Sequence, residues 1–364
     1  MNLKKNLIRV FSLFALACLF LGSCTQKWVI QDPYETVNWN NHKQYKANFH
    51  AHTTVSDGRM NPHSVVDKYK ELGYQILAIT DHNAVTYPWT GFSSIEASKT
   101  SVKRMVDLPE EMPENLTYED RNPNELGMID IQGNEFSRHH HTGSYFNGHG
   151  GTKTEEESFQ AIAAKGGIAI LNHPGRYRGS YRREHLNFYS IDWYAEQFKK
   201  HDHLIGLEVY NQGDRYPEDR QTWDSILSVT MPERPVWGYS NDDMHFLEGL
   251  GYNWNMMILP GLTHEWVRHG MENGLCYFVH APEGHDGPPV PVIQSIKVDD
   301  KRGTIEISAL KCDSIKWITG GKVLASGSKI DLKDIKEDIH YIRAELYGKG
   351  KSVVGSQPFG LIKR

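Results

Sequence analysis

Histidines and carboxylates recur where short apolar segments end in the middle of this 364-residue chain. His50 and His52 end the first such segment, and residues two apart on a strand point the same way, so both rings can face one metal ion. Five later segments end in the same manner, at Asp81-His82, Glu135, Asn172-His173, Asn211 and Asp242-Asp243-Met244-His245. Imidazoles and carboxylates that converge would repel or stay unpaired unless a cation neutralises them. The pattern therefore predicts a shared metal site.

The elements that must position these residues alternate between helices and strands. A helix is predicted over residues 61–73, with proline at its first position and an apolar stripe, and a strand follows at 75–80. Thr154 and Glu157 form a capping box for another helix, ahead of a buried strand at 168–171. Such alternation predicts a parallel sheet or barrel, in which the carboxyl ends of the strands meet at one mouth.

The alternation extends over residues 45–283, which we predict to form one α/β domain. Residues 86–127 are rich in Pro, Glu and Asn and are interpreted as an insertion over one end of it. Residues 284–293 are rich in Pro and Gly and indicate a linker. Beyond the linker the apolar period becomes two, so residues 294–364 are predicted to form a small all-β sandwich without chemistry of its own.

The first residues have the form of a targeting signal. Three basic residues precede an apolar run that is too short to span a bilayer comfortably. The run ends in Leu21-Gly22-Ser23-Cys24, which resembles the lipobox of bacterial lipoproteins; an ordinary secretory signal with a chance cysteine is the alternative. The lipobox predicts a signal peptide at 1–23, a lipid on Cys24, a tether at 24–44 and a lipid-anchored protein of the bacterial cell envelope, on the periplasmic face or the outer surface.

The overall composition excludes one class of partner. The net charge of −5 is spread without long like-charged blocks, so the chain has no nucleic-acid-binding signature. Beyond the signal and the anchor only Cys276 and Cys312 remain. They could pair in an oxidising compartment or stay free thiols, and an ordinary hydrophobic core must hold the fold in either case.

The chain from about Tyr45 to Glu283 resembles the polymerase-and-histidinol-phosphatase (PHP) family. The resemblance depends on the order and spacing of five motifs: His50-Ala51-His52-Thr53 with Ser56-Asp57-Gly58, Ile79-Thr80-Asp81-His82-Asn83, Glu135, Asn172-His173-Pro174, and Asp243-Met244-His245. It implies an α/β fold in the form of a distorted (β/α)₇ TIM-like barrel. It also implies two or three divalent metal ions, of zinc, manganese or iron.

The resemblance, carried over residue by residue, implies three groups of ligands. These are His50, His52, Glu135 and Asp243 for one ion, Glu135 as a bridge with His173 for a second, and Asp57, His82 and His245 for a third. Several family members supply another histidine to the second ion from the strand that here ends in Asn211. We expect Asn211 to be that ligand or to hold a water, because Glu208 points to the opposite side if the strand is regular.

This set predicts hydrolysis of phosphate esters by a metal-bridged hydroxide, with a small phosphorylated substrate. Cations a few Å apart lower the pKa of a bridging water and bind phosphoryl oxygens. Asp81 is expected to orient His82 or the shared water, or else to cap a turn. Arg176 closely follows His173 and offers a guanidinium fork to phosphate. The predicted catalytic residues are Asp81, His245 and Arg176.

Two other functions fit the same residues. A bridging hydroxide also attacks carbonyl carbon, so a metal-dependent amidohydrolase that cleaves C–N or C–O bonds is one alternative. A catalytically inactive surface lipoprotein that binds glycans is the other. Retention of so many charged residues argues against an inactive site, because buried charges without a cation are costly.

Two further clusters are discounted as metal sites. The run His139-His140-His141 cannot present three consecutive side chains to one ion on a strand, so we expect one of them, His141, to point into the mouth and touch substrate. Trp89 and Phe92 in the insertion could cap the pocket, but we interpret them as the small core that folds the insertion.

Overall fold

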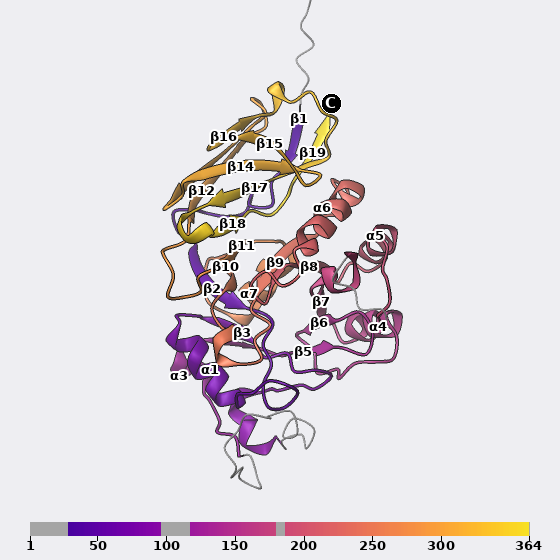
Figure 1. Cartoon of the computed structure of the whole chain (residues 1–364), viewed down its shortest axis with the longest axis vertical. Helices are drawn as coiled ribbons and strands as arrows, with labels where there is room; N and C mark the ends of the chain where they lie inside the picture. The colour runs from indigo at the N-terminus through magenta and orange to yellow at the C-terminus, as the bar shows by residue number, and fades with distance from the viewer. Residues whose placement is uncertain (1–27, 96–116, 180–185, 364) are drawn as a thin grey trace, which may run out of the picture.

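The computed structural model describes residues 28–95, 117–179 and 186–363 as a mixed α/β protein with three sheets (Figure 1). Helices gather in the part formed by the first 283 residues, and the rest of the chain is built almost entirely of strands. The predicted signal peptide and the lipid on Cys24 lie outside the described residues, so both stay predictions. Among the described helices, none combines the length and the apolar character that crossing a bilayer requires.

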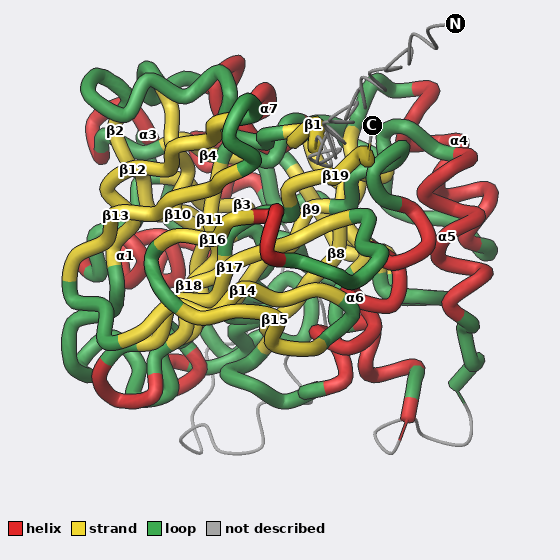
Figure 2. The backbone as a smooth tube through the Cα atoms, turned by 90° about the horizontal axis from the view of Figure 1, so that it is seen from above, coloured by secondary structure: helices red, strands yellow, loops and turns green. Residues whose placement is uncertain are grey.

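One sheet of five strands carries half of the candidate site. In order across the sheet its strands are β5 (Gly133–Phe136), β6 (Thr142–Tyr145), β7 (Ile168–Leu171), β8 (Leu204–Asn211) and β9 (Trp237–Asn241). Only β7, β8 and β9 are parallel neighbours, whereas β5 and β6 form an antiparallel hairpin. Helices α4 (Glu155–Ala164), α5 (Ile191–Lys200) and α6 (Glu218–Thr230) accompany these strands, and α4 and α5 lie together at one end of the molecule (Figure 2).

Local signals start these helices as the sequence predicts. The Thr154 hydroxyl accepts a hydrogen bond from the Glu157 amide, and the Ser190 hydroxyl accepts one from the Trp193 amide. Each satisfies an amide that the first helical turn leaves unpaired. The predicted helix after Asn61 is also confirmed, as α1 (Pro62–Glu71) with proline in its first turn.

The second half of the site comes from a large sheet of eleven strands. Its α/β portion contains β2 (Lys43–Asn48), β3 (Ile76–Ala78), β4 (Ile129–Ile131), β10 (Asn253–Leu259) and β11 (Cys276–His280). Strands β2, β3 and β4 are parallel, and β10 joins β2 in the antiparallel sense. Helix α7 (His264–Glu272) packs on β10, and the short α3 (Pro123–Leu126) leads into β4.

The distorted (β/α)₇ TIM-like barrel that the family resemblance implies is not shown. The two sheets meet through two isolated bridges, Ala51 with Met244 and His82 with Glu135. Where the chain after β2 meets β9, a side chain takes the place of a backbone ladder: the Phe49 amide donates to Asn241 Oδ1 at 2.9 Å. Backbone groups at the junction of the two sheets that lack a ladder partner need such side-chain partners.

The C-terminal segment is all-β. Its strands are β12 (Val292–Asp299), β13 (Thr304–Leu310), β14 (Ser314–Thr319), β15 (Lys322–Ser326), β16 (Lys329–Asp331), β17 (Tyr341–Tyr347), β18 (Val353–Gly355) and β19 (Phe359–Lys363), with 3₁₀ turns at Leu332–Asp334 and Lys349–Lys351. A three-stranded sheet, β12-β13-β16, shares one hydrophobic core with the large sheet, through Ile296, Ile307 and Trp317 among others.

Residues 284–291, within the predicted linker, form turns and irregular chain, and the C-terminal segment is in addition hydrogen-bonded to the α/β part. Strand β18 pairs with β11, so the large sheet runs without interruption from one part into the other. A buried ion pair adds to the junction, because the Arg343 guanidinium lies 2.7 Å from the Asp224 carboxylate of α6. The two parts therefore pack as one body across this seam.

The predicted N-terminal tether is wrong for its described portion. Strand β1 (Trp28–Gln31) pairs antiparallel with β19, and the two lie side by side at the C-terminal end of the molecule (Figure 1). The Trp28 indole is buried and donates to the Leu332 carbonyl. An apolar ring that packs in a core cannot belong to a solvated spacer.

The remaining predictions on the scaffold concern aromatic residues and thiols. Trp89 and Phe92, in a 3₁₀ segment at Trp89–Ser94, are fully buried in the core that contains α1, as expected for the core of the insertion. Residues 96–116 of that insertion lie outside the described residues. Cys276 and Cys312 are free thiols and form no disulfide.

Candidate metal centre

The ends of strands from both sheets bring the predicted residues to one place. His50 and His52 follow β2, His82 follows β3, and Glu135 lies within β5. His173 and Asp243 follow β7 and β9 with φ angles of 30° and 45°, in the left-handed region. Non-glycine residues pay on the order of 1–3 kcal/mol for that conformation, so the surrounding structure must hold these two side chains in place.

Glu135 lies at the centre of the cluster. Its Oε1 is 3.3 Å from His50 Nε2, 3.1 Å from His141 Nδ1 and 3.3 Å from His173 Nε2, and its Oε2 is 2.8 Å from His82 Nδ1 and 3.6 Å from His52 Nε2. One fully buried carboxylate therefore faces five imidazoles. That is the arrangement of a bridging ligand.

Asp243 and Asp57 complete the two flanks of the cluster. Asp243 Oδ1 lies 3.2 Å from His50 Nε2, 3.0 Å from His52 Nε2 and 3.6 Å from His245 Nδ1. Asp57 lies 3.4 Å from His82 Nε2, 3.4 Å from His245 Nε2 and 3.6 Å from His52 Nδ1. Eight of the nine residues predicted as ligands therefore share one cluster, and Asn211 is the exception.

The donor atoms of this cluster fit cations better than they fit one another. Glu135 Oε2, Asp243 Oδ1, His82 Nδ1 and His141 Nδ1 are buried, yet none makes a hydrogen bond within the described part of the chain. His50 Nε2 and His52 Nε2 face each other at 3.0 Å. Buried polar atoms are nearly always paired, and imidazole and carboxylate lone pairs that converge on one volume are the ligand set of Zn²⁺, Mn²⁺ or Fe²⁺.

The electrostatics of the cluster keep its carboxylates ionised. Burial alone would raise the pKa of Glu135, but His141, His50 and His82 hold it well below its usual range. Burial likewise opposes a positive charge on His82. The neighbouring Glu135 and Asp57 nevertheless raise the pKa of His82 to about 10. The carboxylates are therefore in their metal-binding form over the whole physiological range of pH.

His141 belongs to the cluster, although the sequence predicts it only as a substrate contact. Its neighbours in the run are elsewhere: His139 Nε2 lies 2.7 Å from Ser158 Oγ, and His140 Nε2 lies 2.8 Å from the Tyr194 hydroxyl. Burial lowers the pKa of His141 to about 4, so its ring is neutral and can ligate. The β5–β6 hairpin brings the chain back beside Glu135, and the sequence alone does not predict the register of this hairpin.

Glu208 faces the cluster, which contradicts the expectation that it points away. Strand β8 has a register shift between Glu208 and Tyr210, so residues three apart can share a face. The Glu208 carboxylate is 2.9 Å from His50 Nδ1 and accepts from the His173 amide at 2.9 Å. Asn211 donates to the same carboxylate at 2.9 Å, and its Oδ1 is buried without a hydrogen-bond partner in the described part of the chain. Its role as a ligand or water holder stays a prediction.

Of the two roles expected for Asp81, its hydrogen bonds agree with the cap of a turn. Its carboxylate accepts hydrogen bonds from the Thr53 amide, the Thr53 hydroxyl, Ser56 Oγ and Thr86 Oγ1, at 2.5–2.7 Å. All four possible bonds of the carboxylate are used to hold the turn that leads to Asp57. The structure shows no contact between the Asp81 carboxylate and the His82 ring among the described residues, so the effect of Asp81 on the site passes through the position of Asp57.

The cluster forms the floor of a cavity of about 680 Å³. Arg176 lines this cavity, as predicted, together with Arg59 and Arg215, which the sequence analysis did not single out. Arg59 reaches the mouth because its amide donates to the His245 carbonyl at 2.6 Å, a contact between segments far apart in the sequence. The three guanidinium groups make the mouth attractive to anions.

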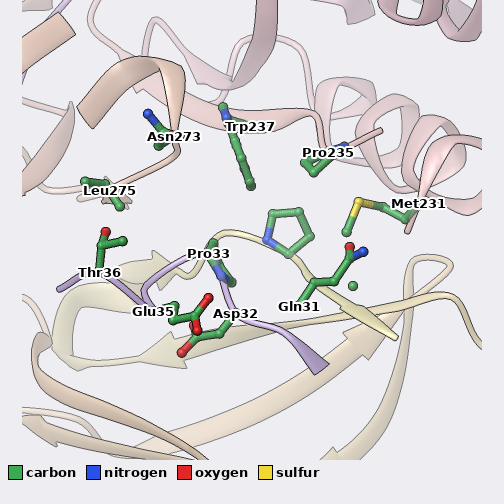
Figure 3. Close-up of a pocket in the computed structure, with 12 residues that line it drawn as sticks. Gln31, Asp32, Pro33, Glu35, Thr36, Met231, Pro235, Trp237, Asn273 and Leu275 are labelled. Carbon is green, nitrogen blue, oxygen red and sulfur yellow. The ribbon is translucent and has the colours of Figure 1, made fainter. Parts of the chain in front are cut away.

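A separate cavity of about 240 Å³ lies between the N-terminal segment, the C-terminal strands and the α/β part (Figure 3). Asp32 and Glu35 face Trp237 and Pro235 across it. The described residues that line it include no histidine, which distinguishes this lining from that of the first cavity.

Comparisons with known proteins find similarity to solved structures at low sequence identity. No family model matches the sequence, and no curated protein matches it. A two-domain protein from Bacteroides vulgatus, which contains a predicted PHP-like metal-dependent phosphoesterase, has a TM-score of 0.48 and 15% identity, covering 89% of this chain and 96% of its own. A protein from Bifidobacterium adolescentis, also described as a metal-dependent phosphoesterase, has a TM-score of 0.36 and 16% identity, covering 62% of this chain and 96% of its own. An amidohydrolase from Chromobacterium violaceum, solved with sulfate and no metal, has a TM-score of 0.36 and 14% identity, with the same coverage. At these identities the site itself must carry the argument for function.

Proposed function

We propose that this chain is a metal-dependent hydrolase of phosphate esters. One observation carries the proposal: buried carboxylate and imidazole atoms, which have no hydrogen-bond partner among the described residues, converge beneath a cavity that three arginines line. Buried ligands of this kind select divalent cations, and guanidinium groups at the mouth select an anionic substrate. The two features together favour phosphate esters over neutral amides or esters.

The ligand groups that the cluster offers agree with two or three ions. They are His50, His52 and Asp243; His50, Glu135 and His173; His82, Glu135 and His141; and His52, Asp57, His82 and His245. His50, His52, His82 and Glu135 each appear in two of these groups, and Glu135 is the one among them with two carboxylate oxygens, so we assign it as the bridge. Bound divalent cations would lower the pKa of a coordinated water and offset the charge of the phosphoryl oxygens.

The protein's own groups would orient the reactants. Arg176 lies one turn beyond His173, so its guanidinium can hold phosphoryl oxygens above the cluster. Gln212 donates to Asp243 Oδ2 at 3.1 Å and receives a hydrogen bond from Arg215, which fixes both side chains at the mouth. Glu208, behind His50, fixes the ring nitrogen that faces the cluster.

The test is metal content and turnover of the full chain. Elemental analysis of protein purified without added metal should find divalent ions, and Mn²⁺ or Zn²⁺ should support turnover of p-nitrophenyl phosphate or its bis-ester. Asp243→Ala should lose metal and at least about a hundredfold in kcat/KM, because it removes a ligand shared by three histidines.

The matched control is Asp338→Ala, an aspartate that is 79% exposed and distant from the cluster, which should retain full activity. Equal activity of the two variants would show that the proposed site does not carry the activity. A metal-loaded protein that turns over neither phosphate ester but hydrolyses an amide would instead support an amidohydrolase.

A further inference from the structure

A further cavity, called here the adjoining cavity, lies next to the cavity that contains the metal cluster. It has a volume of about 270 Å³ and is formed by the segments that follow β8 and β9. Four of its lining residues also line the metal cavity, and these are Gln212, Asp243, His245 and Phe246. Two of the four, Asp243 and His245, are members of the ligand cluster. The adjoining cavity therefore begins at the cluster itself, where the bond to be cleaved would lie.

The linings of the two cavities differ in charge. Arg59, Arg176 and Arg215 line the metal cavity, whereas no lysine or arginine is among the described residues that line the adjoining cavity. The adjoining cavity has instead the carboxylate of the exposed Glu248 in its lining. An anionic group is therefore attracted to the metal cavity and repelled from the adjoining one.

The adjoining cavity also offers apolar surface. Met244, Phe246 and Tyr252 line it, and the Phe246 ring, which is 44% exposed, borders both cavities. The buried carboxylate of Asp242 in the same lining is occupied, because it accepts hydrogen bonds from three backbone amides and two tyrosine hydroxyls. Rings and aliphatic side chains around a concave space favour an organic group without charge.

We infer that the adjoining cavity binds the leaving group of the substrate, and that this group is uncharged and apolar, such as an alkyl-substituted ring. The inference rests on the proposed phosphoesterase function and names its substrate class: phosphate esters of apolar alcohols or phenols. The phosphoryl group lies between the arginines, and the ester oxygen lies at the border that Asp243 and His245 form. On hydrolysis the P–O bond to the organic group breaks, water supplies the new oxygen on phosphorus, and the group leaves as its alcohol with one proton.

Two substrates that differ only in apolar bulk test the inference. The phenols released from 4-methylphenyl phosphate and 4-isopropylphenyl phosphate have nearly equal acidity, so the two esters have similar intrinsic reactivity. The metal-loaded full chain should hydrolyse the isopropyl ester with a kcat/KM about tenfold higher, mainly through KM, because two further carbons are buried. High ionic strength should leave this preference unchanged, since it does not depend on charge.

Gly249 allows the adjoining cavity to be narrowed without altering a metal ligand. A Cβ at this position would lie 3.8 Å from Phe246 Cε2 and 3.9 Å from Met244 Cα, at ordinary contact distance from two lining residues. Gly249→Val should therefore bring the ratio of the two kcat/KM values close to one, with unchanged metal content. The matched control is Gly261→Val, which meets only Trp266 at 3.8 Å, lies outside both cavities, and should keep the activity and the preference.

A second variant tests the apolar wall without adding bulk. Phe246→Ala removes an exposed ring at the border of the two cavities, so it should lower the preference for the isopropyl ester. A full preference retained in both Phe246→Ala and Gly249→Val would overturn the placement of the leaving group in this cavity.

The unaltered chain separates failure of the inference from failure of the proposed function. Equal kcat/KM values for the two esters would overturn the apolar leaving-group site and leave the phosphoesterase standing. Turnover of neither ester, with metal bound, would overturn the proposed function and the inference with it.

Discussion

Glu208 is the residue whose replacement best tests how the cluster is organised. Its carboxylate is fully buried and accepts four hydrogen bonds of 2.9 Å, two on each oxygen. Oε1 faces His50 Nδ1 and the Asn241 amide group, and Oε2 faces the His173 amide and the Asn211 amide group. Glu208→Gln keeps the shape of the side chain but leaves only one oxygen to accept.

Both orientations of the new amide disturb the metal ligands. An NH₂ group toward His50 would make Nδ1 an acceptor and put the proton on Nε2, the atom that faces the cluster. An NH₂ group toward His173 would oppose its backbone amide and displace the turn that carries this ring. Loss of such a partner behind a ligand costs about 10–100-fold in metal affinity, or about 1.4–2.8 kcal/mol.

The assay is calorimetric titration of the metal-free full chain with Zn²⁺ or Mn²⁺, with circular dichroism to verify the fold. The matched control is Glu306→Gln on the exposed face of β13, which makes the same chemical change far from the histidines. Unchanged metal affinity in Glu208→Gln would refute the role of Glu208. Equal loss in both variants would show a general effect of charge.

Three further perturbations have defined outcomes. Arg343→Met leaves the Asp224 carboxylate buried without its guanidinium partner. The free energy of unfolding, measured in urea, should fall by about 3–5 kcal/mol, and a fall below 1 kcal/mol would contradict the role of this ion pair between α6 and β17. Burial raises the pKa of Asp32 to about 6, so the folded state binds this proton more tightly than the unfolded chain, and stability falls as pH rises from about 4 through 6. The free energy of unfolding of Asp32→Asn should therefore exceed that of the unaltered chain by about 2 kcal/mol at pH 8 and should equal it at pH 3.5. Equal gains at both pH values would show that titration of Asp32 is not the cause. His141→Ala should lower bound metal whereas His139→Ala should not, and elemental analysis that finds the same content in both would return His141 to a substrate contact.

Local patterns in the sequence predict much of the scaffold. The proline at the start of α1 and the Thr154 cap of α4 act within one helical turn, so their effect does not depend on distant contacts. The spacing of His50 and His52 likewise sets both rings on one side of an extended segment. Such local patterns can be recognised in the sequence because they involve only residues close together in the chain.

The closure of the two sheets was beyond such patterns. Whether strands form a continuous barrel depends on backbone hydrogen bonds between segments far apart in the chain. At the seam those bonds go to side chains such as Asn241, whose oxygen accepts from the Phe49 amide at 2.9 Å. The junction of β18 with β11 and the packing of β1 on β19 are long-range pairings of the same kind.

For the site, the sequence by itself determined which residue types end the strands, and hence that cations suit them. Only the tertiary structure decided which of those residues face one another. The register shift in β8 turns Glu208 toward His50, the β5–β6 hairpin returns His141 to Glu135, and the Asp57 turn carries Arg59 to His245. A side chain's direction depends on strand register and on contacts across the fold, and neither is encoded in the residues beside it.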